Sequence, residues 1–265
     1  MRKVLFALFI VFAVAAVIFL IQQTNTLKIS HYTWQSGRVP QVFDGFRIVQ
    51  LSDLHSKRFG RAQERLLRAV RAAEPDIIAL TGDFIDDHTR NLNAVRELLE
   101  GIRGLAPIYF VEGNHDTTSP FRGALLALLS QYDVTILDGY TQLERKCNVT
   151  SLSATMSLAG FPYWEPWNFR YPADIVLYHS PEMFFEFAAK GCGLVIAGHN
   201  HGGQVALPSG RALIGPRIEF FPQYSSGVYH ESGATMILSR GLGVSRIPFR
   251  AFATPEIVVI ELKSE

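Results

Sequence analysis

The longest apolar run of the chain lies at its start, over residues 4–21, with Arg2 and Lys3 before it and polar residues 22–25 after it. A helix over this run would be about 27 Å long at ~1.5 Å per residue, close to the thickness of a bilayer's hydrocarbon layer. The small-residue stretch 13–16 is followed by more apolar residues, which favours an uncleaved signal anchor over a cleaved signal peptide. The basic residues before the run predict a cytoplasmic N-terminus and an extracytoplasmic domain, with the cytoplasmic face as the alternative.

The next part of the chain alternates short apolar runs with amphipathic stretches. The apolar runs at 46–51, 76–80 and 107–111 predict buried strands. Between them, residues 62–73 and 91–102 repeat apolar positions at helical spacing, which predicts two amphipathic helices. This order is typical of parallel strands joined by right-handed crossovers, where ligands collect at the carboxyl ends of the strands.

The second half of the chain is richer in strands. The pattern predicts helices at 121–131 and 183–190, a turn and short polar strand within 139–148, and apolar strands at 134–137, 155–161, 174–178, 194–197, 235–238 and 257–262. An α/β fold of two packed mixed sheets flanked by helices accommodates both halves. We therefore expect an anchor over 1–22, a linker and lead-in over 23–44, and one catalytic domain over 45–265.

Composition narrows the class of partner. The 265 residues carry 25 Lys plus Arg against 24 Asp plus Glu, for a net charge of +1, so no nucleic-acid partner is expected. The two cysteines, Cys147 and Cys192, lack the spacing of a structural zinc site, and buried thiols are favoured over one disulfide. The sequence does not indicate the oligomeric state.

Side chains that can bind metal follow the predicted strands at five places. They are Asp53 with His55, then Asp83, then Asn114 with His115 and Asp116, then His179, and last His199 with His201. Each signal is weak alone, because a Gly-Asp pair is usually a turn and loop histidines are often only solvated. Five such strand ends in one chain predict a shared metal site, because carboxyl ends of parallel strands lie at one edge.

These ordered blocks, Asp-x-His, Gly-Asp, Gly-Asn-His-Asp, a lone His and Gly-His-x-His, resemble the calcineurin-like metallophosphoesterase superfamily over residues 45–262. The resemblance implies a four-layer αββα sandwich and a metal-dependent phosphoric ester hydrolase with two metal ions. It implies that Asp53, His55 and His201 hold one ion, that Asn114, His179 and His199 hold the other, and that Asp83 bridges them. Mixed oxygen and imidazole ligands suit Mn, Fe or Zn.

The resemblance leaves His115 outside the ligand set, free to protonate the leaving oxygen or to stabilise charge on the phosphoryl group. An imidazole in that role needs a carboxylate to orient it. Asp86 is the expected partner, since the superfamily commonly carries an Asp three residues after its bridging Asp. Asp116 and Asp87 are the alternatives.

The blocks at 178–182, 198–204 and 239–243 look like the bacterial membrane-associated branch, which includes phosphodiesterases and some UDP-diacylglucosamine pyrophosphohydrolases. Asn200 stands where Thr is commoner, between two ligands. With the anchor, this predicts hydrolysis of phosphodiester or pyrophosphate bonds in lipid or cell-envelope precursors. The alternatives are a phosphomonoesterase acting on soluble metabolites or phosphoproteins, and a non-catalytic scaffold, against which the complete ligand set argues.

Two further groups of residues are candidates for substrate contact. The aromatic segment 161–169 could rest on a membrane or wall a lipid pocket, and packing in the core is the favoured alternative. Arg217, Arg240, Arg246 and Arg250 could bind substrate phosphates in bidentate fashion, and solvation at the surface explains them equally well.

Overall fold

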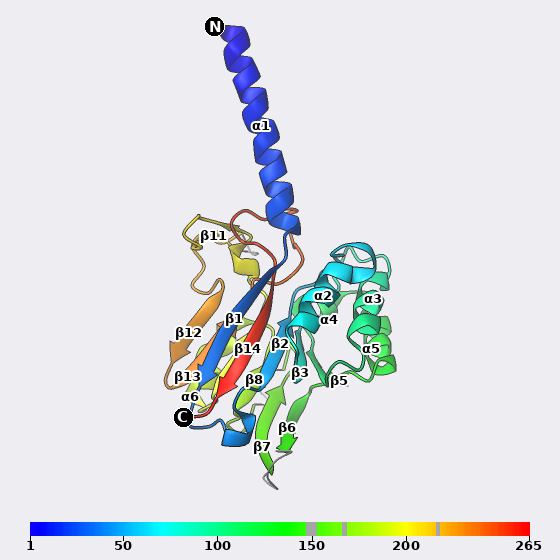
Figure 1. The fold of residues 1–265 in the computed structure, drawn as a ribbon, viewed down its shortest axis with the longest axis vertical. Helices are drawn as coiled ribbons and strands as arrows, with labels where there is room; N and C mark the ends of the chain where they lie inside the picture. The colour runs from blue at the N-terminus through cyan, green and yellow to red at the C-terminus, as the bar shows by residue number, and fades with distance from the viewer. Residues whose placement is uncertain (147–152, 166–168, 216–217) are drawn as a thin grey trace.

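The computed structural model describes residues 1–146, 153–165, 169–215 and 218–265. Two six-stranded sheets form the body of the molecule, and α1 (Arg2–Asn25) projects from one end of it (Figure 1). None of the residues of α1 is buried, and its apolar window has a mean hydropathy of 3.3, so the helix is long and apolar enough to cross a membrane.

The first sheet has the order β1-β14-β2-β3-β4-β5. Its strands are β1 (Lys28–Gln35), β14 (Glu256–Lys263), β2 (Arg47–Leu51), β3 (Ile77–Thr81), β4 (Ile108–Val111) and β5 (Thr135–Ile136). Strands β2 to β5 are parallel, whereas β14 runs antiparallel to β2 and parallel to β1. The second sheet has the order β12-β13-β9-β8-β7-β6, in which the four inner strands are parallel and the pairs β12·β13 and β6·β7 are antiparallel.

The strands of the second sheet follow the predicted strands, apart from β12. They are β6 (Gly139–Lys146), β7 (Ser153–Gly160), β8 (Ile175–Leu177), β9 (Leu194–Ala197), β12 (Gly227–Glu231) and β13 (Ala234–Leu238). The pattern did not predict β12, nor the small separate hairpin of β10 (Val205–Ala206) and β11 (Ala212–Ile214). The strand β6 is also longer than the short polar strand expected there.

Helices cover the outer faces of both sheets. The longer ones are α2 (Glu64–Ala72), α3 (Asn93–Ile102), α5 (Arg122–Gln131) and α6 (Phe184–Ala189), joined by α4 (Asn114–Thr118) and the 3-10 turns η1 (Gln41–Phe43), η2 (Arg61–Gln63), η4 (Pro181–Met183) and η5 (His201–Gly203). Leu66 of α2 and Leu98 of α3 pack with Val49 of the first sheet, while Phe184 of α6 packs with Val195 of the second.

A third apolar cluster lies between the two sheets. Successive strand residues point to opposite faces, so Val49 packs against the helices, while its neighbour Ile48 packs with Ile196 of β9 in the other sheet. The layers are therefore helix, sheet, sheet and helix, which confirms the predicted four-layer αββα sandwich.

One prediction about the lead-in is wrong. The pattern predicts a linker over 23–44, but the structure places β1 there, paired with all of β14, together with the buried ring of Phe43. In β1 only Ser30 and Trp34 are buried, so the strand lacks the apolar alternation that identifies strands in sequence.

Candidate metal centre

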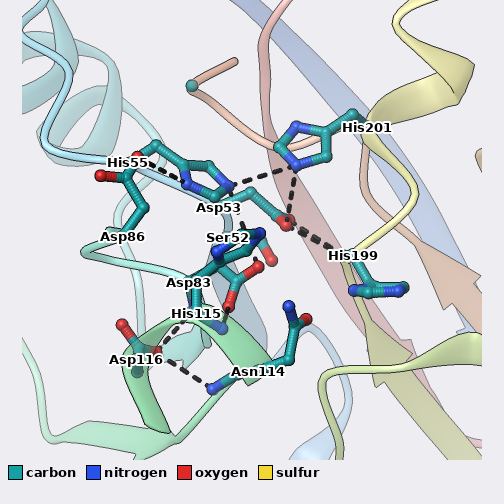
Figure 2. A network of polar contacts seen from close by, with 12 residues as sticks. Ser52, Asp53, His55, Asp83, Asp86, Asn114, His115, Asp116, His199 and His201 are labelled. Carbon is teal, nitrogen blue, oxygen red and sulfur yellow. Dashed lines mark hydrogen bonds and ion pairs between the residues drawn. The ribbon is translucent and has the colours of Figure 1, made fainter. Parts of the chain in front are cut away.

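The metal-binding side chains predicted from sequence lie together at one edge of the sandwich, and Figure 2 labels all of them except His179. Strands β2, β3 and β4 of the first sheet and β8 and β9 of the second end at this edge. Two buried groups, each with ligand atoms within 4.8 Å of one another, are formed by Asp53, His55 and His201 and by Asp83, His179 and His199. The strand-end argument therefore predicted their proximity correctly.

Close distances between ring nitrogens and carboxylates mark each group. His201 Nε2 lies 3.3 Å from His55 Nε2 and 3.5 Å from Asp53 Oδ1. In the other group, His179 Nε2 lies 3.1 Å from both His199 Nδ1 and Asp83 Oδ2. Nitrogens and oxygens that converge in this way, away from water, suit cations held between them.

The carboxylate of Asp83 connects the two groups. Its Oδ2, at 3.1 Å from His179 Nε2, is also 3.8 Å from His55 Nε2 in the first group. Burial raises the pKa of this carboxyl, but the charge and hydrogen bond of His179 outweigh burial and hold the pKa well below its usual range. Asp83 is therefore an anionic side chain facing both groups.

Asn114 provides a direct test of whether the site fits metal ions. Its side-chain Oδ1 is buried and has no hydrogen-bond partner in the part of the chain that the structure describes. A buried amide oxygen without a partner costs about 1–3 kcal/mol, so such atoms usually have a bound ion or water. The residues present therefore fit two metal ions, and the Asn114 oxygen is available as a further donor.

The loops that present these ligands are locally strained. Positive φ angles occur at Asp53 (54°), His55 (47°), Asp83 (56°), His199 (76°) and His201 (50°). Non-glycine residues seldom adopt this left-handed conformation, and those that do cluster at functional sites.

Two glycines let these loops approach each other. A Cβ atom on Gly113 would lie 2.2 Å from Asp83 Oδ1, and one on Gly198 would lie 1.9 Å from Ser52 Oγ. Neither position has room for a side chain, because ligand-bearing loops from different strands touch there.

Asp116 stabilises the loop after β3 and does not orient His115. Its carboxylate accepts backbone N–H groups of Asp83 (2.7 Å), Phe84 (2.8 Å), Ile85 (3.1 Å) and Gly113 (3.0 Å). These four donors fix the backbone from Asp83 to Ile85 next to that of Gly113.

The predicted pairing of Asp86 with His115 is also wrong. Asp86 Oδ2 lies 3.2 Å from His55 Nδ1, while its Oδ1 accepts from His88 N (2.9 Å) and Thr89 Oγ1 (3.2 Å), which turns the carboxylate toward β2. Burial opposes ionisation, but the His55 hydrogen bond and charge outweigh it and lower the pKa of Asp86 to about 2. Asp86 therefore orients a metal-binding imidazole.

The imidazole of His115 remains available for other chemistry. Within the described residues no hydrogen bond reaches this ring. The hydrogen bonds of His115 come from its backbone, whose N–H donates to Asp83 Oδ1 at 2.8 Å and whose carbonyl accepts from Ser119 N at 3.0 Å. Its ring centroid lies 5.1 Å from that of His55, edge to face. The side chain stands beside the centre without belonging to either ligand group.

Two other histidines of the centre, His179 and His201, have partners at the ring nitrogen that points away from it. The carbonyl oxygen of Thr81 accepts the Nδ1–H of His179 at 2.7 Å, which leaves Nε2 directed at the centre. The fully buried Arg250 donates to the carbonyl oxygens of His201 (3.1 Å), Gly243 (2.8 Å) and Ala253 (2.9 Å), and its Nη2 lies 3.1 Å from His201 Nδ1. This arginine supports the loop of a ligand and is neither a surface residue nor a phosphate contact.

The other candidate arginines differ in their surroundings. Arg240 is paired with the buried carboxylate of Glu256 at 2.7 Å, so it is structural. Arg217 lies outside the described residues. Arg246 is exposed and lines the cavities at the metal centre, which leaves it as the candidate for binding substrate phosphate.

Two cavities meet beside His115. One, of about 190 Å³, is lined by Asp83, Asn114, His115, Tyr163, His199, His201, Ser245 and Arg246. The second, of about 290 Å³, is lined by Asp86, Asp87, His88, His115, Ser245 and Arg246. Sequence reasoning did not single out Ser245, which carries no motif and reaches the site only through the fold.

The aromatic segment 161–169 is mostly part of the core. Phe161 and Phe169 are buried in the cluster under α6, which confirms core packing for these two rings, while residues 166–168 lie outside the described part. Tyr163 is the exception, because its ring lies 6.2 Å from that of His179 and 6.1 Å from that of His199. It forms a wall of the first cavity.

Comparisons with known proteins agree with this geometry. Residues 46–203 match the family model described as calcineurin-like phosphoesterase. The metallophosphoesterase YkuE of Bacillus subtilis is 30% identical over 254 residues, which cover 91% of this chain and 87% of YkuE. The phosphodiesterase YaeI of Escherichia coli is 27% identical over 229 residues, covering 82% of each chain. A transmembrane protein with metallophosphoesterase domain from Danio rerio is 28% identical over 286 residues, covering 99% of this chain and 63% of that protein. The chain therefore belongs to the calcineurin-like phosphoesterase family and is a metal-dependent hydrolase of phosphoesters.

Proposed function

We propose that this chain is a membrane-anchored dimetal enzyme that hydrolyses phosphodiester or pyrophosphate bonds. The observation that carries the proposal is the position of Asp83, whose Oδ2 faces His179 Nε2 at 3.1 Å and His55 Nε2 at 3.8 Å. One anionic carboxylate between two groups of imidazoles is the arrangement that a pair of neighbouring cations requires.

The proposed ligand sets follow the two groups. One ion is held by Asp53, His55 and His201, the other by Asn114, His179 and His199, and Asp83 binds both. The mixed oxygen and nitrogen donors suit Mn, Fe or Zn. When bound, such a pair of ions neutralises phosphoryl charge and lowers the pKa of an attacking water.

His115 and Arg246 are the proposed substrate contacts. The His115 ring lines both cavities and has no hydrogen bond in the described part of the chain, so it can donate a proton to a leaving oxygen there. The guanidinium of Arg246 borders the same two cavities, where it can bind non-bridging phosphoryl oxygens. Asp86 contributes indirectly, by orienting His55.

The two cavities support a substrate with groups on both sides of the phosphorus. They share His115, Ser245 and Arg246, so space extends from these residues in two directions. A phosphodiester or a pyrophosphate has a substituent for each direction, whereas a phosphomonoester has only one. This favours the diester or pyrophosphate over the monoester.

The anchor rests on α1 and on the relatives. The helix is unburied, and Arg2 and Lys3 at its start precede its apolar run, which favours an extracytoplasmic catalytic domain. The printed name of the Danio rerio relative also describes a transmembrane protein.

The full chain, purified in detergent, stripped of metal and reconstituted with Mn²⁺, provides the test. Bis(p-nitrophenyl) phosphate, p-nitrophenyl phosphate and a UDP-linked lipid should be compared under the same conditions. The proposal predicts faster hydrolysis of the diester or the pyrophosphate than of the monoester. A preference for the monoester would support a phosphomonoesterase, and no hydrolysis with both ions bound would support a scaffold.

A further inference from the structure

Five large exposed apolar side chains lie on two segments, 218–221 and 249–252, that neighbour the hairpin β10–β11. They are Ile218, Phe220, Phe221, Phe249 and Phe252, and they are 60%, 72%, 53%, 36% and 43% exposed. We refer to these five residues as the apolar collar. Contiguous exposed apolar patches are uncommon on soluble proteins and usually mark an interaction site.

The apolar collar is held by backbone hydrogen bonds on both sides of the hairpin β10–β11. On one side, Phe221 N donates to Leu213 O at 3.0 Å, and Phe220 forms a bridge with Ile214. On the other side, Ala206 N donates to Ala251 O at 2.8 Å. The two segments that carry the collar therefore flank one small structural unit next to the end of α1 (Figure 1).

Direct contacts place this unit at the end of the apolar run. The ring of Phe252 lies 5.1 Å from that of Phe19, which belongs to the run 4–21. Two hydrogen bonds follow within the next turn of the helix, from Arg250 N to Thr24 Oγ1 at 2.9 Å and from Thr254 Oγ1 to Gln23 Oε1 at 3.1 Å.

Little chain separates the apolar run from the domain. At ~1.5 Å per residue, the four helical residues after the run add only about 6 Å. The Phe252 ring, level with Phe19, would then lie in the interfacial layer of any bilayer that α1 crosses. Phe side chains of membrane-surface segments are buried at the boundary between headgroups and acyl chains.

Basic groups around the end of α1 complement an anionic membrane surface. Arg65, which is exposed, donates from Nη2 to the carbonyl of Asn25 at 3.1 Å. In the collar, the guanidinium of Arg211 lies 5.1 Å from the ring of Phe221. Such positive groups beside apolar residues are attracted to anionic lipid headgroups.

The metal centre lies on the side of the domain from which α1 leaves. β1 leads away from the end of α1, and β2 runs antiparallel to β14, which is parallel to β1. The strands β2, β3 and β4 therefore end toward α1, and the metal-binding loops follow these ends. The segment that carries Phe249 and Phe252 also brings Arg246 to the cavities and Arg250 to His201.

We propose that the apolar collar rests in the interfacial layer of the leaflet from which α1 emerges, so that the metal centre opens at the depth of the lipid headgroups. The substrate class is then a phosphodiester or pyrophosphate carried by a membrane lipid. This inference rests on the proposed function for its chemistry and on the geometry of the collar for its location.

Depth-dependent quenching tests the location in the full chain. All variants carry Cys147→Ser, so that the introduced cysteine is the one that reacts with the label. The second native cysteine, Cys192, can stay, because it is buried and burial raises the pKa of its thiol to about 12, which makes it unreactive. An NBD fluorophore is attached at Phe220→Cys in the collar, at Phe12→Cys within α1, or at Glu74→Cys, before the amino end of β3, where the side chain is 79% exposed.

The labelled chains are reconstituted into vesicles of phosphatidylethanolamine and phosphatidylglycerol that contain nitroxide-labelled phospholipid. The proposal predicts quenching at positions 12 and 220 and none at 74. Quenching at 12 without quenching at 220 would overturn the collar while leaving the anchor intact. No quenching at 12 would overturn the anchor and, with it, the collar.

Activity tests the substrate class. The double variant Phe220→Ser and Phe221→Ser should lower hydrolysis of a lipid-borne phosphodiester in these vesicles about tenfold, because it removes apolar contact with the bilayer. It should leave turnover of bis(p-nitrophenyl) phosphate unchanged. The matched control is Tyr171→Ser, an aromatic residue 69% exposed before the amino end of β8, and it should change neither rate.

An equal fall on both substrates in the double variant would show an effect on the fold and overturn the collar's role. If the parent hydrolyses neither substrate, the proposed function fails, whereas the quenching result still decides whether the collar meets the membrane.

Discussion

The substitution Asp86→Asn separates two roles for this carboxylate. In the structure Asp86 Oδ2 lies 3.2 Å from His55 Nδ1, and its side chain is only 16% exposed. A hydrogen bond to a charged group contributes roughly 1.5–3 kcal/mol and a neutral one roughly 0.5–1.5, so the substitution costs about 1–2 kcal/mol. That corresponds to roughly five- to thirtyfold weaker metal binding, which agrees with effects seen for residues behind metal ligands.

The assay is a Mn²⁺ titration of the metal-stripped full chain, with bound metal and the rate on bis(p-nitrophenyl) phosphate measured together. We expect Asp86→Asn to weaken binding of one of the two ions about tenfold and to leave the rate at saturating metal within about threefold of the parent. The matched control is Asp133→Asn, the same chemical change at a side chain that is 79% exposed before the amino end of β5, and it should alter neither quantity. Unchanged metal binding with a large loss of rate would refute this reasoning and restore Asp86 as the partner of His115.

Four further substitutions test other parts of the site. His115→Ala should lower kcat by about 10²–10⁴ while both ions stay bound, and a lost ion in metal analysis would contradict its role. Arg246→Ala should raise KM for the diester about tenfold, with partial recovery in Arg246→Lys, and an unchanged KM would exclude phosphate binding. Gly113→Ala should displace Asp83, since its Cβ would lie 2.2 Å from Oδ1, and full metal occupancy would disprove that crowding. Burial and neighbouring arginines lower the pKa of Lys57 to about 7. Above that pH the lysine is protonated in the unfolded chain but loses its proton in the folded chain, so the free energy of unfolding rises with pH. The destabilising effect of Lys57 therefore diminishes from pH 7 to 9. The gain in Tm from Lys57→Met should therefore shrink over that range, and a pH-independent gain would argue against it.

The main elements and the ligands could be predicted because burial leaves a regular trace in the sequence. Strands such as β3, buried at every position, appear as continuous apolar runs, and α2 shows its buried positions at helical spacing. The ligands follow such strands directly, so the sequence alone predicts that His179 and His199 lie near each other.

What could not be predicted depends on contacts between distant loops. The direction of the Asp86 carboxylate is set by donors from His88 and Thr89, which the spacing from Asp83 does not reveal. Likewise, an arginine such as Arg250 reads as a surface residue in sequence, because the carbonyl groups that bury it come together only in the fold. In β1 only two positions are buried, so no periodic pattern marks it.

The central claim is that two metal ions at this centre hydrolyse the substrate, and metal counting tests it most directly. The stripped full chain should be titrated with Mn²⁺ while bound metal per chain and the rate on bis(p-nitrophenyl) phosphate are followed in the same samples. The account predicts no hydrolysis without metal and a maximum rate when two ions are bound per chain. Full activity in the stripped chain, or no activity with two ions bound, would contradict it.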